Sequence, residues 1–272
     1  MSRRAVPWLL LVAFGMQAFA AALEDSVTID EYFHVPFGLH VLDSGEAGPD
    51  LLNPPLGKAI LALPLVARPD VVASIRDVPA GSMAWTFLDA NRATYGNLFL
   101  PSRIVVILAA LALGVLVFAW AGRLYGPRAG ILALALYAFS ADLLAHGHLA
   151  TLDLAGALCV TWACHAMWRL LERPGALRAA WVGAALAVSI LVKLSGVLLI
   201  PVAVAAFGIG VARDRRFGAW AGRALLGVCA GLLALNLGYG FAGTGTPLSA
   251  LGVPPDSLAG GLARLAPDVP MP

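Results

Sequence analysis

The sequence predicts an all-α membrane protein with about seven transmembrane helices and short amphipathic helices in the first exterior loop. Of its 272 residues 60% are hydrophobic and only 12% are charged, and the mean hydropathy is +0.83. A soluble domain has too little interior to bury that much apolar surface, so the composition indicates a membrane protein. The formal net charge is only +2, so no nucleic-acid partner is expected.

The first apolar run, residues 7–23, follows Ser2-Arg3-Arg4 and ends in several alanines. A basic start, an apolar centre and a small-residue end are also typical of a cleavable signal peptide. The run is short for a membrane span and long for a signal-peptide core, so both alternatives stay open. In either case the loop that follows lies on the exterior.

That exterior loop, residues 24–100, is of mixed polarity and contains two stretches with helical spacing. Residues 30–42 alternate polar and apolar side chains, and residues 55–67 are apolar and follow Pro54. A proline in the first turn of a helix gives up no hydrogen bond, so the second helix is expected to begin near Pro55. Both stretches are too short to cross a bilayer, and we expect them to lie at its surface.

Six further apolar runs predict six further spans, at residues 102–120, 129–145, 149–170, 179–192, 197–211 and 219–241. The runs at 179–192 and 197–211 are short for a hydrocarbon core of about 30 Å. One long span covering both is the alternative, but the segment Lys193-Leu194-Ser195-Gly196 makes its centre too polar. Two tilted spans that meet at an exterior turn are therefore favoured.

The distribution of charge supports seven spans with a cytoplasmic N-terminus. The interior segments then hold 11 of the 18 basic residues and 2 of the 16 acidic ones, which leaves 7 basic and 14 acidic residues outside. Basic interior loops are what the positive-inside rule requires. We expect a multi-pass protein of the plasma (inner) membrane whose functional site faces the periplasm or exterior.

Two regions follow from this topology. Residues 1–242 form the transmembrane module, including the exterior loop, and residues 243–272 form an exterior Gly/Pro-rich segment. We expect that segment to begin a second module that this chain lacks and that a partner could supply. The three cysteines lie in apolar runs without metal-ligand spacing and are expected to pack as apolar residues.

Polar side chains from distant segments converge on the exterior face of this topology. The first loop, the turn after the third span and the turn after the fifth span supply them: Asp30, Glu31, Lys58, His146, His148, Asp153 and Lys193. Ionisable groups at membrane depth are costly unless they are paired or functional. A lysine can hold a lipid-linked phosphate, and a carboxylate can take a proton from an attacking hydroxyl.

Three motifs carry a resemblance to a known family: Asp30-Glu31, the segment from Asn53 to Lys58 (NPPLGK), and the segment from His146 to Asp153 (HGHLATLD). They resemble the group of protein O-mannosyltransferases and aminoarabinose transferases, which are GT-C membrane glycosyltransferases that use dolichyl- or polyprenyl-phosphate sugars. Where that group typically has arginine and histidine, this chain has His148 and Asn53. The resemblance implies a GT-C-like bundle truncated after its seventh helix.

The resemblance also implies site roles. Asp30 corresponds to the catalytic base of an inverting transfer, Lys58 to the contact with the donor phosphate, and Asp153 to a second exterior acid. Glu31, His148, Asp153 and Lys193 are expected to bind substrate. No cofactor is required, although the two loop carboxylates could hold a divalent cation together with substrate oxygens. The expected partners are the lipid-linked donor, an acceptor protein or lipid, and the bilayer.

Each residue also has a structural alternative. Asp30 could be a solvated loop acid, Glu31 a helix-start acid, Lys58 a snorkelling lysine and Asp153 a helix cap. Trp85, in the exterior loop, could line a substrate groove. At the level of function, the alternatives are a non-catalytic lipid-phosphate-binding or scaffold subunit and, less favoured, a transporter, because no repeat relates two halves of the chain.

Overall fold

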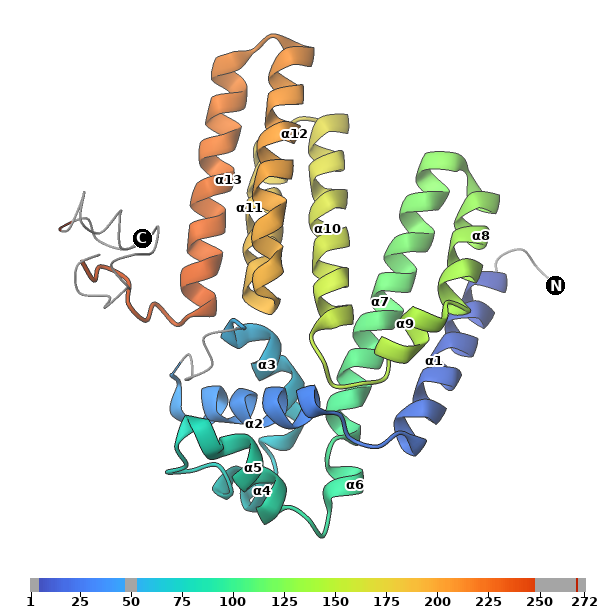
Figure 1. Cartoon of the computed structure of the whole chain (residues 1–272). Helices are drawn as coiled ribbons and strands as arrows, with labels where there is room; N and C mark the ends of the chain where they lie inside the picture. Colours follow the sequence, from blue (N-terminus) through green and yellow to red (C-terminus); the bar gives the residue numbers. More distant parts are fainter. Residues whose placement is uncertain (1–4, 47–52, 248–267, 269–272) are drawn as a thin grey trace.

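A computed structural model describes residues 5–46, 53–247 and 268, and in this part of the chain the regular structure is entirely helical. Seven apolar helices run alternately between two ends of the molecule (Figure 1). In chain order they are α1 (Val6–Glu24), α7 (Leu100–Tyr125), α8 (Pro127–Ala138), α10 (Asp153–Glu172), α11 (Ala176–Val192), α12 (Leu199–Asp214) and α13 (Phe217–Gly238).

Among the described residues, five segments are long and apolar enough to cross a membrane: 6–24, 95–125, 153–172, 194–214 and 217–238. They confirm the all-α class and the multi-pass character of the protein. Helices α8 and α11 are shorter, with 12 and 17 residues, so the sixth and seventh spans stay predictions. The side of the membrane that each end faces stays a prediction as well.

The helix boundaries correct two of the expected spans. The run 129–145 is broken at Phe139 and Ser140, after which α9 (Ala141–His146) takes a new direction (Figure 1). Residues 147–152 form a turn rather than the first turn of the next span, so α10 begins at Asp153. The predicted break near Lys193 is present, because α11 ends at Val192 and a 3-10 helix, η2 (Leu194–Leu198), follows.

The segment between α1 and α7 forms a layer of short helices across the lower ends of the long ones (Figure 1). Its elements are α2 (Ile29–Ser44), α3 (Pro55–Ala62), η1 (Leu63–Leu65), α4 (Pro69–Ala73), α5 (Ala80–Ala90) and α6 (Tyr95–Leu98). Helices therefore form at both stretches that the sequence indicated. They are not isolated on a surface, because the layer has its own buried core around Val35, Leu65 and Phe87.

The long helices form two groups that diverge upward from this layer (Figure 1). Helices α1, α7 and α8 pack around Phe14, Ala110 and Tyr137, whereas α10 to α13 pack around Ala163, Val182 and Trp220. Within the second group α11 and α13 approach closely: a Cβ atom added to Gly183 would lie 1.8 Å from the carbonyl oxygen of Gly227. Only glycine permits such a contact, as in many membrane helix pairs.

Candidate functional site

A buried ion pair fixes the start of α2. The Arg103 guanidinium, at the start of α7, donates to both carboxylate oxygens of Glu31 at 2.7 and 2.9 Å. Its remaining N–H groups donate to backbone carbonyls at the end of α1, at 2.8 to 3.0 Å: those of Ala22, Asp25 and Ser26. Five contacts engage all five N–H donors of the guanidinium. In the sequence, no motif or spacing distinguishes Arg103 from the other basic residues.

Glu31 also holds the turn before α10. The backbone N–H of Ala150 donates to Glu31 Oε1 at 2.9 Å, and the N–H of Thr28 donates to Oε2 at 2.8 Å as part of a capping box. Burial raises the pKa of the Glu31 carboxyl, but the hydrogen bonds from Arg103, Ala150 and Thr28 outweigh it and hold the pKa below its ordinary value. Both carboxylate oxygens are thus engaged by the protein, and the expected direct contact with substrate has no free oxygen to use.

Asp30 lies beside the Glu31–Arg103 pair, which anchors the start of α2, but its side chain faces outward. It occupies the first turn of α2 and is exposed, and in the described part of the chain its carboxylate accepts no side-chain hydrogen bond. Adjacent residues of an α-helix project about 100° apart, so Glu31 enters the interior while Asp30 leaves it. The anchor therefore fixes the position of an accessible carboxylate.

Lys58 lies on α3, where glycines allow close packing. Its backbone carbonyl would be 2.0 Å from a Cβ atom on Gly38 of α2, and a Cβ atom on Gly57 would be 2.7 Å from the carbonyl oxygen of Val192. The Lys58 side chain is fully buried, with Nζ 5.8 Å from the centroid of the Phe37 ring. The lysine therefore does not snorkel to the surface, and a donor phosphate reaches it only by displacing part of what covers it.

Asp153 and Lys193, expected separately, form one pair. Lys193 Nζ lies 2.5 Å from Asp153 Oδ1, and both side chains are more than a third exposed. His146 Nδ1 is 3.8 Å from the other carboxylate oxygen. Lys193 reaches this position because the chain is extended there, between α11 and η2. The pair offers an accessible ammonium at the lower end of the second helix group.

His148 is buried and engaged at both ring nitrogens. Nδ1 lies 2.7 Å from the carbonyl oxygen of Leu144, and Nε2 lies 2.6 Å from Asp25 Oδ2. This geometry joins the 147–152 turn to the end of α1 and leaves no nitrogen for the expected phosphate contact. Asp25 carried no signal in the sequence that distinguished it from other loop acids.

Trp85, the one tryptophan singled out in the exterior loop, belongs to an aromatic cluster beside Asp30. Its ring centroid lies 5.4 Å from that of Tyr32 and 6.5 Å from that of Phe33. Phe33 in turn stacks on Phe37 with centroids 6.3 Å apart and planes 7° apart. Aromatic rings thus run along α2 from the neighbourhood of Asp30 to the ring against which Lys58 lies.

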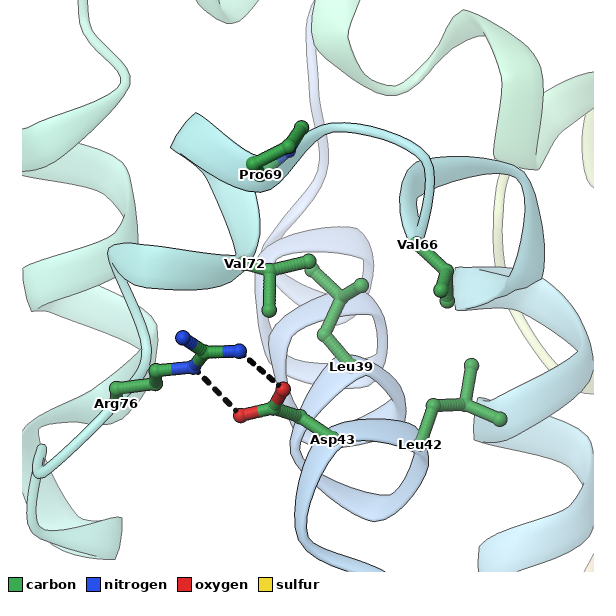
Figure 2. Close-up of a pocket in the computed structure, with 7 residues that line it drawn as sticks. All are labelled: Leu39, Leu42, Asp43, Val66, Pro69, Val72 and Arg76. Atoms are coloured by element: carbon green, nitrogen blue, oxygen red, sulfur yellow. Dashed lines mark hydrogen bonds and ion pairs between the residues drawn. The ribbon is translucent and has the colours of Figure 1, made fainter.

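A cavity of about 330 Å³ lies at the other end of α2 (Figure 2). Its lining residues are Leu39, Leu42, Asp43, Val66, Pro69, Val72 and Arg76. Arg76 and Asp43 form a two-pronged ion pair at 2.8 and 2.9 Å, which holds the pKa of the Asp43 carboxyl below its ordinary value. Asp43 follows Asp30 by 13 residues, about 20 Å along a helix, so this cavity is separate from the candidate site.

The candidate site therefore joins four segments: the start of α2, the start of α3, the turn before α10 and the end of α11. No cluster of three or more His, Cys, Asp or Glu side chains suited to a metal ion occurs in the part of the chain that the structure describes. The expected cofactor independence is left untested by this observation and stays a prediction.

Comparison with known proteins identifies a family. The family model described as dolichyl-phosphate-mannose-protein mannosyltransferase matches residues 83–236, which is more than half of the 272-residue chain. The matched region contains Arg103, His148, Asp153 and Lys193, whereas Asp30 and Lys58 precede it. No curated protein and no solved structure shows a significant match to the chain.

Proposed function

The chain belongs to the dolichyl-phosphate-mannose-protein mannosyltransferase family, and from this membership we propose that it transfers a sugar from a polyprenyl-phosphate donor to an acceptor hydroxyl. The family implies a glycosyltransferase that depends on a lipid-linked sugar, and the membrane helices place the chain in a bilayer. The acceptor is a protein or a lipid, and the reaction takes place at the exterior face of the membrane.

The proposed step is a single displacement with inversion. The acceptor oxygen attacks the anomeric carbon of the donor sugar while its proton passes to the Asp30 carboxylate. The bond between the anomeric carbon and the phosphate oxygen breaks, and its electron pair leaves with the polyprenyl phosphate. Asp30 then releases the proton to solvent. All atoms and electrons balance without a cofactor.

The other residues divide into phosphate contacts and positioning residues. Lys58 and the accessible Lys193 supply positive charge for the departing phosphate, which a lysine binds as a compact point charge. Asp153 orients Lys193 through their ion pair. Glu31 and His148 act indirectly, because their polar atoms hold the segments that carry Asp30 and Asp153.

The observation that carries the proposal is the contrast between two adjacent acids. Glu31 is buried and engaged by Arg103, whereas Asp30 is exposed and held beside it by the same helix. A general base needs an accessible carboxylate in a fixed place, and Asp30 meets both conditions.

The test is transfer of a labelled sugar from a polyprenyl-phosphate donor in membranes that contain the full chain. We expect Asp30→Asn to lower the rate at least about 100-fold, the usual contribution of a general base, while donor binding persists. Asp43→Asn, at the other end of α2, is the matched control and should leave the rate unchanged. Undiminished transfer by Asp30→Asn would remove Asp30 from the mechanism. Donor binding by the wild-type chain without any transfer would favour the non-catalytic lipid-phosphate-binding alternative.

A further inference from the structure

The aromatic cluster on α2 and α5 has a composition and a position that the roles above do not use. Phe33 and Trp85 are 37% and 51% exposed, so their rings face the surroundings as well as each other. Tyr32 contacts both rings, with its ring centroid 5.6 Å from that of Phe33 and 5.4 Å from that of Trp85.

Helical spacing sets Phe33 between the two ends of the proposed reaction. Asp30 and Phe33 are three residues apart and Phe33 and Phe37 four, so the three side chains follow one another along one face of α2. Lys58 lies over the Phe37 ring at 5.8 Å. The order along this face is thus base, exposed aromatic ring, buried aromatic ring and ammonium.

The acceptor hydroxyl, the sugar and the phosphate of the bound substrates must lie in a matching order. In a displacement with inversion the acceptor hydroxyl and the phosphate lie on opposite sides of the anomeric carbon. A sugar whose phosphate approaches Lys58 and whose reacting carbon is within reach of the acceptor held by Asp30 lies between them. The residue at that place on α2 is Phe33.

We propose that Phe33, supported by Trp85 and Tyr32, forms the surface on which the sugar of the donor stacks; this inference rests on the proposed function. The C–H faces of a sugar ring pack against the electron-rich face of an aromatic ring. The transition state of glycosyl transfer is oxocarbenium-like, and an aromatic face also attracts the developing positive charge. The ligand class is therefore the pyranose or furanose ring of the lipid-linked donor.

A membrane anchor is the other role for exposed aromatic rings, since such residues are common at bilayer interfaces. That role concerns lipid in general and does not depend on a sugar. A comparison of two lipids that differ only in the sugar therefore separates the two roles.

The experiment measures equilibrium binding to the full chain in nanodiscs, with polyprenyl phosphate and polyprenyl-phosphate mannose of equal chain length. We expect Phe33→Leu to weaken binding of the mannose-bearing lipid about 3- to 10-fold and to change binding of polyprenyl phosphate less than twofold. Phe139→Leu, the same substitution at an exposed ring at the end of α8, is the matched control and should change neither.

Three outcomes would overturn the assignment. In the first, Phe33→Leu weakens binding of both lipids equally, which indicates a membrane anchor. In the second, it weakens binding of neither lipid. In the third, the wild-type chain binds both lipids equally well. If Phe33→Leu lowers the unfolding temperature, Trp85→Leu is the second variant. Trp85→Leu should selectively weaken binding of the mannose-bearing lipid, by a smaller factor than Phe33→Leu. Selective binding that depends on Phe33 in a chain without transfer activity would uphold the sugar surface and overturn the proposed catalysis.

Discussion

Arg103 and Glu31 lie 72 positions apart in the chain and meet in a buried ion pair in which every guanidinium N–H has an acceptor. The pair connects α1, α2, α7 and the turn before α10, and the proposed base is the neighbour of one of its members. Stability and activity are therefore linked at this point.

Arg103→Met is expected to destabilise the protein by about 3–5 kcal/mol, because it leaves the Glu31 carboxylate buried without its partner. The double variant Arg103→Met/Glu31→Gln removes that unpaired charge as well and should recover part of the loss. Denaturant unfolding in detergent measures both. The role of the pair would be contradicted if Arg103→Met were as stable as the wild type. It would also be contradicted if the double variant lost more stability than the two single variants lose when their losses are added.

Low pH should weaken the Glu31–Arg103 pair, because it protonates the Glu31 carboxylate. The pKa of Glu31 is lower in the folded protein than its ordinary value of 4.5, so the folded state favours the ionised form. The corresponding stability is fully present above about pH 4.5 and is lost as the pH falls through the folded-state pKa. We expect the unfolding temperature to fall less steeply below pH 4.5 in Glu31→Gln than in the wild type. Identical slopes would show that Glu31 does not contribute.

Gly38→Ala is expected to displace α3 from α2, because the new Cβ atom would lie 2.0 Å from the carbonyl oxygen of Lys58. The expected cost is about 1–3 kcal/mol, together with weaker binding of polyprenyl phosphate, since Lys58 moves. Gly81→Ala in α5 is the matched control: its Cβ atom meets no atom within 4 Å, and the change should stay within about 1 kcal/mol. Equal effects at the two glycines would argue against the close contact.

Lys193→Gln should affect binding more than stability. The Lys193–Asp153 pair is partly exposed, and such pairs contribute at most about 1 kcal/mol to folding. A charged hydrogen bond to a phosphate is worth more, so we expect affinity for polyprenyl phosphate to fall roughly 10-fold or more. Arg92→Gln breaks an exposed ion pair with Asp89 and serves as the control. Unchanged affinity in Lys193→Gln would exclude the lysine from the phosphate site.

The sequence predicted the features that depend on local pattern. Apolar runs located the long helices, and the polar segment after Val192 marked the break between α11 and η2. Hydropathy did not predict the turn at 147–152, because Leu149, Ala150 and Leu152 are apolar, and Ala150 and Leu152 are buried there without being in a helix. Whether a short apolar run continues a helix or turns away depends on contacts made by distant segments.

The site was also predicted only in part, because its contacts join segments that are distant in the chain. The sequence brought Asp153 and Lys193 to one face of the membrane, but their pairing depends on the directions of α10 and α11. Glu31 and His148 carry the residue types of a substrate site, yet their partners, Arg103 and Asp25, are 72 and 123 positions away. Residue type and spacing indicate what a side chain can do, whereas its partners decide what it does.

The contacts of Arg103 also set an order for the synthesis of the protein. The carbonyls of Ala22, Asp25 and Ser26 emerge from the ribosome about 80 residues before the guanidinium that binds them. Until α7 has been made, these carbonyls and the Glu31 carboxylate lack the guanidinium that joins them, and Glu31 has only its local capping-box contact with Thr28. The layer of short helices therefore gains its Arg103 contacts only after α7 has been made, and a chain stalled before Arg103 would hold Asp30 on a loop without them.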